Sequence, residues 1–354
     1  MFDAETLNAF AGGYKVSAAG VITIAGSPEF SNVNYSISIP VSLSLSALTK
    51  ADSMVRWRGT NVVNIPYEIS RTSNDWFDPI KIMMNISIQR GWTSPPSILA
   101  NEDLKFHMGM GYYSAFVDVL IQSFSLVNNV NLSAAEAIEL SSEVQEMARG
   151  FHTAIETLTR INGKDENVFI YDKRSKTFKN EHLKLEPYSL LAISENYLEE
   201  NENYQSFKKN FNRFLSLGMA SQNPSSLSYP FLNFHNHLSA EEEMVNKITN
   251  ALMKDDSQEF ASSVSKYSQS LGFNLGVVSN FQRIVASLLE RYSINDYLFA
   301  VNEYSGSVIV FSDSLGQKKI SENLVRDYYN ITNRTLSVRE ISNKNTTGKD
   351  RIVV

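Results

Sequence analysis

A glycine turn followed by an almost entirely apolar segment constrains this chain more than any other feature. Gly109, Met110 and Gly111 lead into a segment from Tyr113 to Val127 that is apolar nearly all round. A helix without a wide polar face has to be buried on all sides. We therefore predict a central helix around which the neighbouring elements pack.

Strict alternation predicts β-structure before this helix. Between Tyr35 and Leu48, apolar side chains alternate with serines and with Pro40. A period of two predicts a strand with one buried face, and Pro40 marks an edge, a bend or a bulge because it cannot donate to a ladder. The segment from Tyr14 to Ala25 also has strand character and is closed by Gly26-Ser27-Pro28. The first part of the chain is therefore rich in strands.

Helices dominate the remainder. Ser133 and Glu136 form a capping-box pattern that predicts a helix to about Met147. Further elements are expected as a helix at 152–161, a strand at 168–171, a strand and then a helix within 186–217, a helix from the capping box at Ser239 to Lys254, helices at 256–271 and 277–291, strands at 297–302 and 307–311, and a helix and then a strand within 318–342. The last ten residues are polar and are expected to fray. This order predicts an α+β fold in two lobes, at 1–180 and 181–354.

Composition excludes several classes of protein. With 354 residues, the chain is too long for one ordinary core. A net charge of −6 argues against binding to nucleic acid, which requires lysine and arginine. The sequence contains no cysteine, so disulfides and thiolate chemistry are excluded. Neither a long apolar span nor a secretory signal is apparent, and we expect a cytoplasmic protein that does not enter membranes.

The glycine turn can hold a phosphate group. Two glycines let the backbone approach a ligand, and the following helix start offers free N–H groups with a partial positive charge. The same residues are also compatible with a tight turn that only introduces a core helix. Gly-x-Gly alone does not separate these two interpretations.

The segment resembles the phosphate loop of the GHMP kinases, a superfamily that includes galactokinase, homoserine kinase and mevalonate kinase. The family sequence is of the type Gly-Leu-Gly-Ser-Ser-Ser-Ala. Its matches here are Gly109, Met110, Gly111, Ser114 and Ala115. Tyr112 and Tyr113 replace two serines, and the family proline before the loop is missing.

Other stretches resemble the same family in order and spacing, over about residues 14 to 340. Gly20 and Gly26 match the opening motif, but Val21 stands where the family has a basic residue and Ser27-Pro28 replaces Glu-His. Only Gly306 remains of the glycine-rich hairpin near the C-terminus. The resemblance implies an N-terminal lobe like domain 2 of ribosomal protein S5 and a ferredoxin-like C-terminal lobe.

The resemblance also implies an ATP- and Mg²⁺-dependent phosphoryl transfer to a hydroxyl of a small, anionic metabolite. The implied nucleotide-binding residues are Gly109, Met110, Gly111, Tyr112, Tyr113 and Ser114. Ser114 would ligate Mg²⁺ and take part in catalysis, although a hydroxyl there can equally cap the helix. Glu156 lies near the register of the family's catalytic aspartate and is the candidate base. Its alternative role is that of a solvated glutamate on an amphipathic helix.

The substrate site is less defined. Gly26 and Ser27 are substrate-binding candidates because they match or follow the opening motif of the family. Basic residues that could bind an anionic substrate are Arg56, Arg58, Arg71, Lys81 and Arg90. Arg58 and Arg71 are the preferred candidates, although ordinary surface charge explains all five. His235 and His237 could form a metal pair, but no third ligand accompanies them and a structural role is favoured.

Several functions stay open. The most specific candidate resembles a branch from acidophilic archaea that phosphorylates mevalonate 3-phosphate at its 5-hydroxyl. A galactokinase-like sugar kinase is an alternative. The departures at Val21, Tyr112, Tyr113 and the C-terminal hairpin also fit a non-catalytic binding or regulatory protein, or a lyase that works without ATP. The two tyrosines could block the nucleotide site or build it. A small-molecule substrate is the expected partner, and a homodimer is an open alternative to a monomer.

Overall fold

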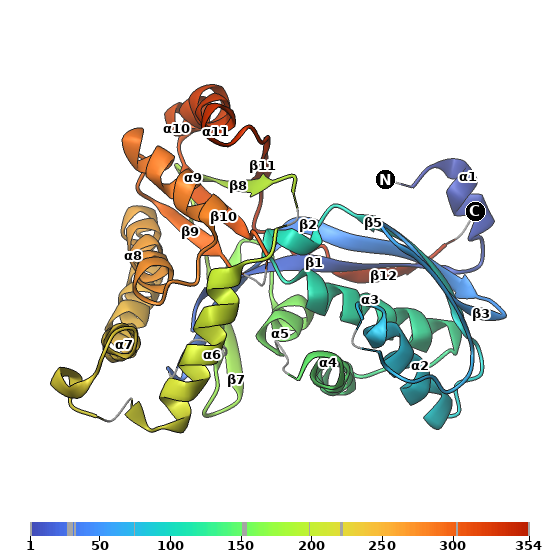
Figure 1. The fold of residues 1–354 in the computed structure, drawn as a ribbon. Coiled ribbons are helices and arrows are strands. Elements are labelled where there is room, and N and C mark those ends of the chain that lie inside the picture. The colour runs from blue at the N-terminus through green and yellow to red at the C-terminus, as the bar shows by residue number, and fades with distance from the viewer. Residues whose placement is uncertain are drawn as a thin grey trace.

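The computed structural model describes residues 2–26, 31, 33–73, 75–150, 154–197, 199–219, 222–301 and 304–352. These residues form two lobes, each built on its own β-sheet with helices against it (Figure 1). The α+β class in two lobes is therefore confirmed. None of the helices within the described ranges has the length and apolar character that crossing a bilayer would demand.

The first lobe contains an eight-stranded sheet with the main order β12-β1-β2-β5-β3-β4, and β6 and β7 extend it from β2. The strands are β1 (Tyr14–Ala25), β2 (Tyr35–Ala51), β3 (Met54–Arg58), β4 (Val62–Pro66), β5 (Pro96–Glu102), β6 (Asn167–Asp172), β7 (Thr177–His182) and β12 (Gly348–Arg351). The helices are α1 (Ala4–Ala9), α2 (Asp78–Gln89), η1 (Phe106–Met108), α3 (Tyr112–Val127), α4 (Ala134–Arg149) and α5 (Ala154–Asn162). Helices α2 to α5 lie together on one side of this sheet (Figure 1).

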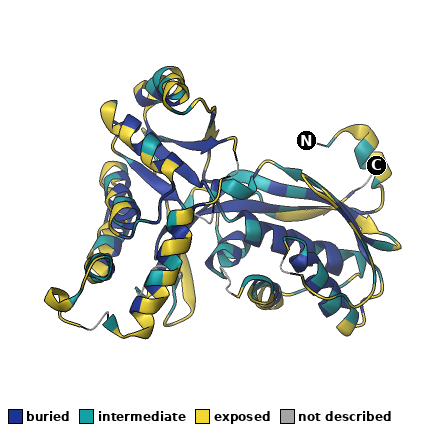
Figure 2. Ribbon diagram, viewed as in Figure 1, coloured by how far each residue is buried: buried dark blue, intermediate teal, exposed yellow. Residues whose placement is uncertain are grey.

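Helix α3 occupies the centre of the first lobe, as its sequence predicts. It packs against β1, β2, α2, α4 and α5. Phe116, Val117, Val119 and Leu120 are all buried. Figure 2 shows most of α3 and the central strands of both sheets in the buried class. Burial of this apolar side-chain area, at about 25 cal/mol per Å², is the main force that holds the lobe together.

Strand β2 differs from the prediction of a single buried face. Ser36 and Ser38 are as fully buried as Ile37 between them. The hydroxyl of Ser36 donates to the Gly26 carbonyl at 2.6 Å, and that of Ser38 lies 2.6 Å from the Thr159 hydroxyl of α5. The serines can be buried because each hydroxyl finds a partner. Pro40 lies close to a break in the β1–β2 register, which confirms the predicted irregularity.

The second lobe has a four-stranded antiparallel sheet in the order β11-β8-β10-β9. Its strands are β8 (Ser189–Glu195), β9 (Tyr297–Ala300), β10 (Ser307–Ser312) and β11 (Leu336–Ile341). Its helices are α6 (Glu202–Ser216), η3 (Pro224–Ser226), α7 (Phe231–Met253), α8 (Ser257–Gln269), η4 (Ser270–Asn274), α9 (Asn280–Arg291), α10 (Ser314–Lys319), η5 (Ile320–Leu324) and α11 (Val325–Thr332). Helices separate β8 from the β9–β10 pair and that pair from β11, which is the expected ferredoxin-like arrangement.

The predicted start of one helix is wrong. Helix α7 begins at Phe231 rather than after Ser239. Ser239 lies inside the helix, and its hydroxyl is 3.3 Å from Nδ1 of His235. The local capping pattern was misleading because residues before it continue the helix. His235 and His237 therefore lie on a helix and not on one face of a strand.

The expectation of a frayed end is also wrong for residues 348–351. Strand β12 pairs antiparallel with β1, beginning opposite Ser17. Just before it, the Thr347 hydroxyl accepts a hydrogen bond from the Ala19 N–H at 3.0 Å. A polar segment is stable here because β1 would otherwise present an unpaired edge. The end of the chain thereby returns to the first lobe (Figure 1).

A buried polar cluster connects the two lobes. The Tyr267 hydroxyl of α8 accepts a hydrogen bond from the Gly26 N–H at 2.9 Å and donates to Glu241 of α7 at 2.9 Å. His237 is fully buried, with Nε2 4.0 Å from the Glu241 carboxylate. Burial lowers the pKa of His237 to about 4. The end of β1 is thus held against two helices of the second lobe.

We expect His237 to make the protein less stable in mild acid. Its folded pKa of about 4 lies below its ordinary value of 6.5, so only the unfolded chain takes up this proton between those values. Keeping His237 neutral therefore contributes at most about 3 kcal/mol to the free energy of unfolding. This contribution is complete above pH 6.5 and is lost as the pH falls towards 4. Urea unfolding of the wild type and His237→Gln between pH 7.5 and 4.5 measures it. The wild type should lose more stability than the variant, and parallel pH dependence would contradict the assignment.

Candidate functional site

Two glycines shape the turn that enters α3. Gly109 and Gly111 have φ values of 70° and 69°, in the left-handed region that glycine adopts most readily. A Cβ atom on Gly109 would collide with the Ala300 carbonyl of the second lobe, and one on Gly111 would meet the Glu156 carboxylate. Glycine is therefore needed here for backbone conformation and for close packing.

The turn leaves the start of α3 without a side-chain cap. Gly111 is the N-cap residue and can provide none. The first N–H groups of a helix have no partners within it, so they can donate to an anion. Met110 contributes differently, because its side chain is fully buried and its carbonyl accepts a hydrogen bond from the Val21 N–H at 2.9 Å. Met110 thus anchors the turn to β1 and to the core.

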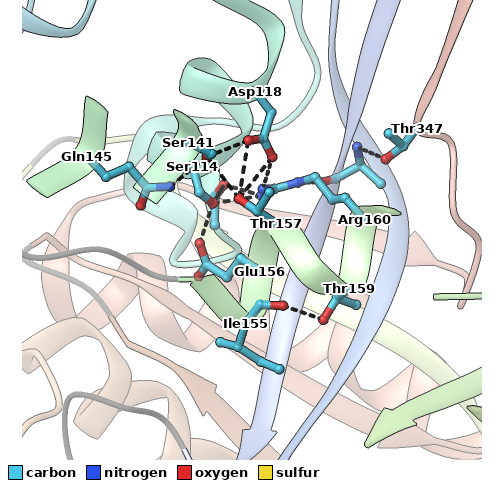
Figure 3. Close-up of polar contacts among 12 residues, drawn as sticks. Ser114, Asp118, Ser141, Gln145, Ile155, Glu156, Thr157, Thr159, Arg160 and Thr347 are labelled. Atoms are coloured by element: carbon cyan, nitrogen blue, oxygen red, sulfur yellow. Dashed lines mark hydrogen bonds and ion pairs between the residues drawn. The ribbon is translucent and has the colours of Figure 1, made fainter. Parts of the chain in front are cut away.

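The structure brings Ser114 and Glu156 together. Helix α5 places the Glu156 carboxylate against the first turn of α3, where the Ser114 hydroxyl donates to it (Figure 3). The Ser114 hydroxyl also lies 3.0 Å from the Gly111 carbonyl. Ser114 lies inside the helix and does not cap it. The two predicted catalytic residues thus form one polar pair.

Arg160, which no sequence pattern singles out, fixes this pair from the buried side. One guanidinium nitrogen lies 2.9 Å from the Ser114 hydroxyl and 2.6 Å from the Gly111 carbonyl. Its Nε donates to the Ala19 carbonyl of β1 at 2.6 Å. The remaining nitrogen forms an ion pair with Asp118 at 2.8 Å (Figure 3). Arg160 is 2% exposed, so it positions the site without reaching solvent.

Asp118 provides the counter-charge within α3. Its carboxylate also accepts hydrogen bonds from Ser141 at 2.7 Å and from Thr157 at 3.2 Å. Burial raises the pKa of Asp118, whereas Arg160 and the two hydroxyls act to lower it. Asp118 is the sole charged residue of the α3 sequence. A single charge in an apolar helix was the available signal that a buried partner exists, but the sequence does not identify that partner.

A pocket of about 640 Å³ lies beside the start of α3. Half of its lining residues are aromatic, with His107 counted, and its charged side chains are two cations and two carboxylates. The lining residues are Thr60, Asn61, Asp75, Trp76, Glu102, Lys105, Phe106, His107, Tyr112, Tyr113, Phe116, Ala148, Arg149 and Tyr304. Ser114 and Glu156 do not line it, so the pocket and the polar pair lie on different sides of the helix start.

The two loop tyrosines line this pocket and leave its volume open. Tyr112 is 8% exposed and packs against Phe106 with ring centroids 5.4 Å apart. Its hydroxyl interacts with Glu102, and burial raises the pKa of Tyr112. The Tyr113 ring lies beneath the Arg149 guanidinium, 3.8 Å from its central carbon. The tyrosines therefore form part of the wall.

The predicted substrate residues do not form one cluster. Gly26 lies at the lobe junction, and Ser27 falls outside the described residues. Arg58 ends β3, which β2 and β5 separate from β1, and Arg71 lies in the segment before α2. Both arginines are exposed, and neither lines the pocket. Their role in substrate binding stays a prediction.

Two of the other basic candidates form ion pairs with nearby acidic residues. Arg56 pairs with Asp52 at 3.2 Å, and Lys81 with Asp75 at 2.9 Å. Across the part of the chain that the structure describes, no three acidic or histidine side chains gather as metal ligands.

Comparisons with known proteins show similarity of fold. No protein-family model and no curated protein sequence matches the chain. The galactokinase of Lactococcus lactis, solved with galactose, superposes with a TM-score of 0.79 at 12% identity, over 96% of this chain and 95% of that one. Mevalonate kinase of Methanococcus jannaschii gives 0.67 at 13% identity, over 93% and 97%. Phosphomevalonate kinase of Streptococcus pneumoniae gives 0.59 at 12% identity, over 93% and 99%.

These similarities establish the architecture. The chain has the same two-lobed fold as these galactokinase, mevalonate kinase and phosphomevalonate kinase structures. Identities near 12% carry no information about which reaction a particular member performs.

Removing the charge of Asp118 should strongly destabilise the protein. Asp118→Asn leaves the Arg160 guanidinium buried without its counter-ion, which typically costs about 3–5 kcal/mol. Urea unfolding at neutral pH measures the loss. Ser123→Ala is the matched control, because Ser123 is buried in the same helix and its hydroxyl has no hydrogen-bond partner among the described residues. The control should stay within about 1 kcal/mol of wild type, and equal effects of the two changes would refute a stabilising ion pair.

Proposed function

We propose that this protein transfers the terminal phosphoryl group of ATP to a hydroxyl group of a small metabolite. The observation that carries the proposal is the Ser114–Glu156 pair, placed at an uncapped helix start that two left-handed glycines introduce. A hydroxyl, a carboxylate and the backbone N–H groups of a helix start at one point are the parts that phosphoryl transfer uses.

The site fits ATP in shape and in chemistry. The N–H groups at the start of α3 suit phosphate oxygens, and the helix dipole favours their negative charge. The adjacent pocket of about 640 Å³ lies within the size range of small-molecule sites, and its aromatic walls suit a nucleobase. A nucleotide that spans both would place its terminal phosphate near Ser114.

The oxygen atoms of Ser114 and Glu156 also fit Mg²⁺. This ion prefers oxygen ligands and usually keeps only one or two from the protein, with the rest from phosphates and water. Ser114 would hold it, with the Glu156 carboxylate beside it. Bound there, Mg²⁺ would neutralise charge on the transferred group.

The side chains of this site would act chiefly by holding the reacting groups in position. Glu156 would accept the proton of the attacking hydroxyl, and the Ser114 hydroxyl already donates to that carboxylate. Arg160 fixes both Ser114 and the Gly111 carbonyl. Because phosphoryl transfer depends more on alignment than on a base, this rigid arrangement is the main contribution of the protein.

The acceptor would be a small molecule with a free hydroxyl. Galactose, mevalonate and mevalonate 3-phosphate are the compounds to test first, since galactokinase and mevalonate kinases share the fold. Mevalonate 3-phosphate is the most specific of these, because Ser27-Pro28 replaces the Glu-His pair of ordinary galactokinases and mevalonate kinases and so points to a divergent substrate.

One observation favours a second function, that of a non-catalytic binding protein. Ser114 is fully buried, and its hydroxyl already contacts Gly111, Glu156 and Arg160. A hydroxyl so engaged can serve the structure of the loop alone. Nucleotide binding without phosphoryl transfer would support this alternative.

Mg-ATP should raise the thermal stability of the protein. A ligand at 100 times its Kd adds about 2.7 kcal/mol to the free energy of unfolding. Scanning fluorimetry with Mg-ATP, with ATP in EDTA and with Mg²⁺ alone measures the effect and separates the ion from the nucleotide. The same melting temperature in all three solutions, at millimolar ATP, would rule out the proposal.

Changes at the polar pair should reduce turnover more than nucleotide binding. Glu156→Gln removes the proton acceptor and should lower kcat about 10²- to 10⁴-fold. Ser114→Ala should raise the Mg²⁺ concentration needed for activity. ADP release with the acceptors above measures both, and Ser123→Ala serves as the control from the same helix. Full activity of Glu156→Gln would exclude its role as base, and an unchanged Mg²⁺ requirement in Ser114→Ala would remove Ser114 from the metal site.

A further inference from the structure

The pocket beside α3 carries a cation in a fixed orientation. The Arg149 guanidinium, from the last turn of α4, lies 3.8 Å from the centre of the Tyr113 ring and 5.9 Å from that of Phe106. A guanidinium stacked on a ring keeps its N–H groups in its own plane, where they can donate to oxygen atoms. The stacking therefore directs the N–H groups of Arg149 along the face of the Tyr113 ring.

The acidic residues of the same pocket are occupied by other partners. Glu102 accepts hydrogen bonds from the N–H and the hydroxyl of Thr60 at 3.1 and 2.8 Å. Asp75 forms an ion pair with Lys81 at 2.9 Å. The ion pair offsets the charge of Asp75 and the bonds from Thr60 occupy the oxygen atoms of Glu102, while Arg149 and Lys105 add positive charge to the wall. The pocket is thus suited to an anionic ligand.

Arg149 also lies close to the anion-binding end of α3. Its platform, Tyr113, is the second residue of that helix, directly after the uncapped Gly111-Tyr112 step. A phosphate chain seated on the helix N–H groups would start within a side chain's length of Tyr113. Arg149 and the helix start can therefore bind the same chain of phosphates from two sides.

We propose that Arg149 binds the polyphosphate of the nucleotide and that Tyr113 positions it. This inference rests on the proposed nucleotide site and adds a specificity for nucleoside di- and triphosphates over nucleosides. Tyr113 takes the place of a serine of the related loop sequence. The ring thus contributes by orienting a guanidinium, where a serine would have contributed its own hydroxyl. Two parallel N–H···O bonds from arginine to phosphate would account for the specificity.

Affinities for ATP, ADP and adenosine test this proposal by isothermal titration calorimetry. Arg149→Gln should weaken ATP binding about 10-fold or more and change adenosine binding less than about 3-fold. The ATP affinity of Arg149→Lys should lie between those of the wild type and Arg149→Gln, because lysine keeps the charge and loses the planar fork. Tyr113→Phe should bind ATP like wild type because it retains the ring, whereas Tyr113→Leu should weaken ATP selectively.

Arg213→Gln is the control for lost surface charge, since Arg213 is exposed on α6 and outside the pocket. Equal weakening of ATP and adenosine by Arg149→Gln would overturn the proposal, and so would ATP binding that matches wild type. A wild-type protein that binds adenosine as tightly as ATP would overturn it as well. Absence of binding for all three ligands in the wild type would instead refute the proposed function itself, together with this inference.

Discussion

The guanidinium of Arg160 connects the segments from which the candidate site is built. It bonds to β1 through Ala19, to the glycine turn through Gly111, and to α3 through Ser114 and Asp118. A buried cation must find partners for its charge and for its N–H groups, or folding fails. The position of α5 relative to the start of α3 follows from these bonds. Ser114 and Glu156 meet for that reason.

The same helix start has two chemical sides. One carries the polar pair, and the other faces a pocket of aromatic rings with Arg149 on its wall. The second lobe contributes to this region, because Ala300 packs against Gly109 of the turn and the Tyr304 ring lies 4.7 Å from that of Phe106 in the pocket. The site is thus complete only when the lobes are docked. The buried contacts of Tyr267 with Gly26 and Glu241 help to hold them in place.

The loop tyrosines illustrate how one fold accommodates different side chains. At 12% identity to a galactokinase, the backbone still superposes with a TM-score of 0.79. The fold depends on the buried face of each element, which many sequences satisfy. Ligand contacts depend on single side chains. Tyr112 and Tyr113 can therefore rebuild the wall of a pocket while the glycine turn and α3 keep their geometry.

Sequence patterns predicted those features that depend on local chemistry. The apolar segment at 113–127 specified a central helix, and the glycines at 109 and 111 specified the turn before it. Where the structure differs from these predictions, contacts with neighbouring helix residues or with a distant strand outweigh the local sequence pattern. Ser239 has a capping pattern but lies within a longer helix, and the polar residues 348–351 form a strand because β1 offers an open edge.

By itself, the sequence determined the α+β class, the two lobes, the central helix and the glycine loop, because periodicity and turn residues act over a few neighbouring positions. The tertiary structure alone decided that Asp118 pairs with Arg160, that Arg149 stacks on Tyr113, and that Glu156 meets Ser114. The members of each pair lie on different helices, far apart in the sequence. A charge in an apolar helix shows that a partner must exist, but only the packing of those helices determines which residue it is.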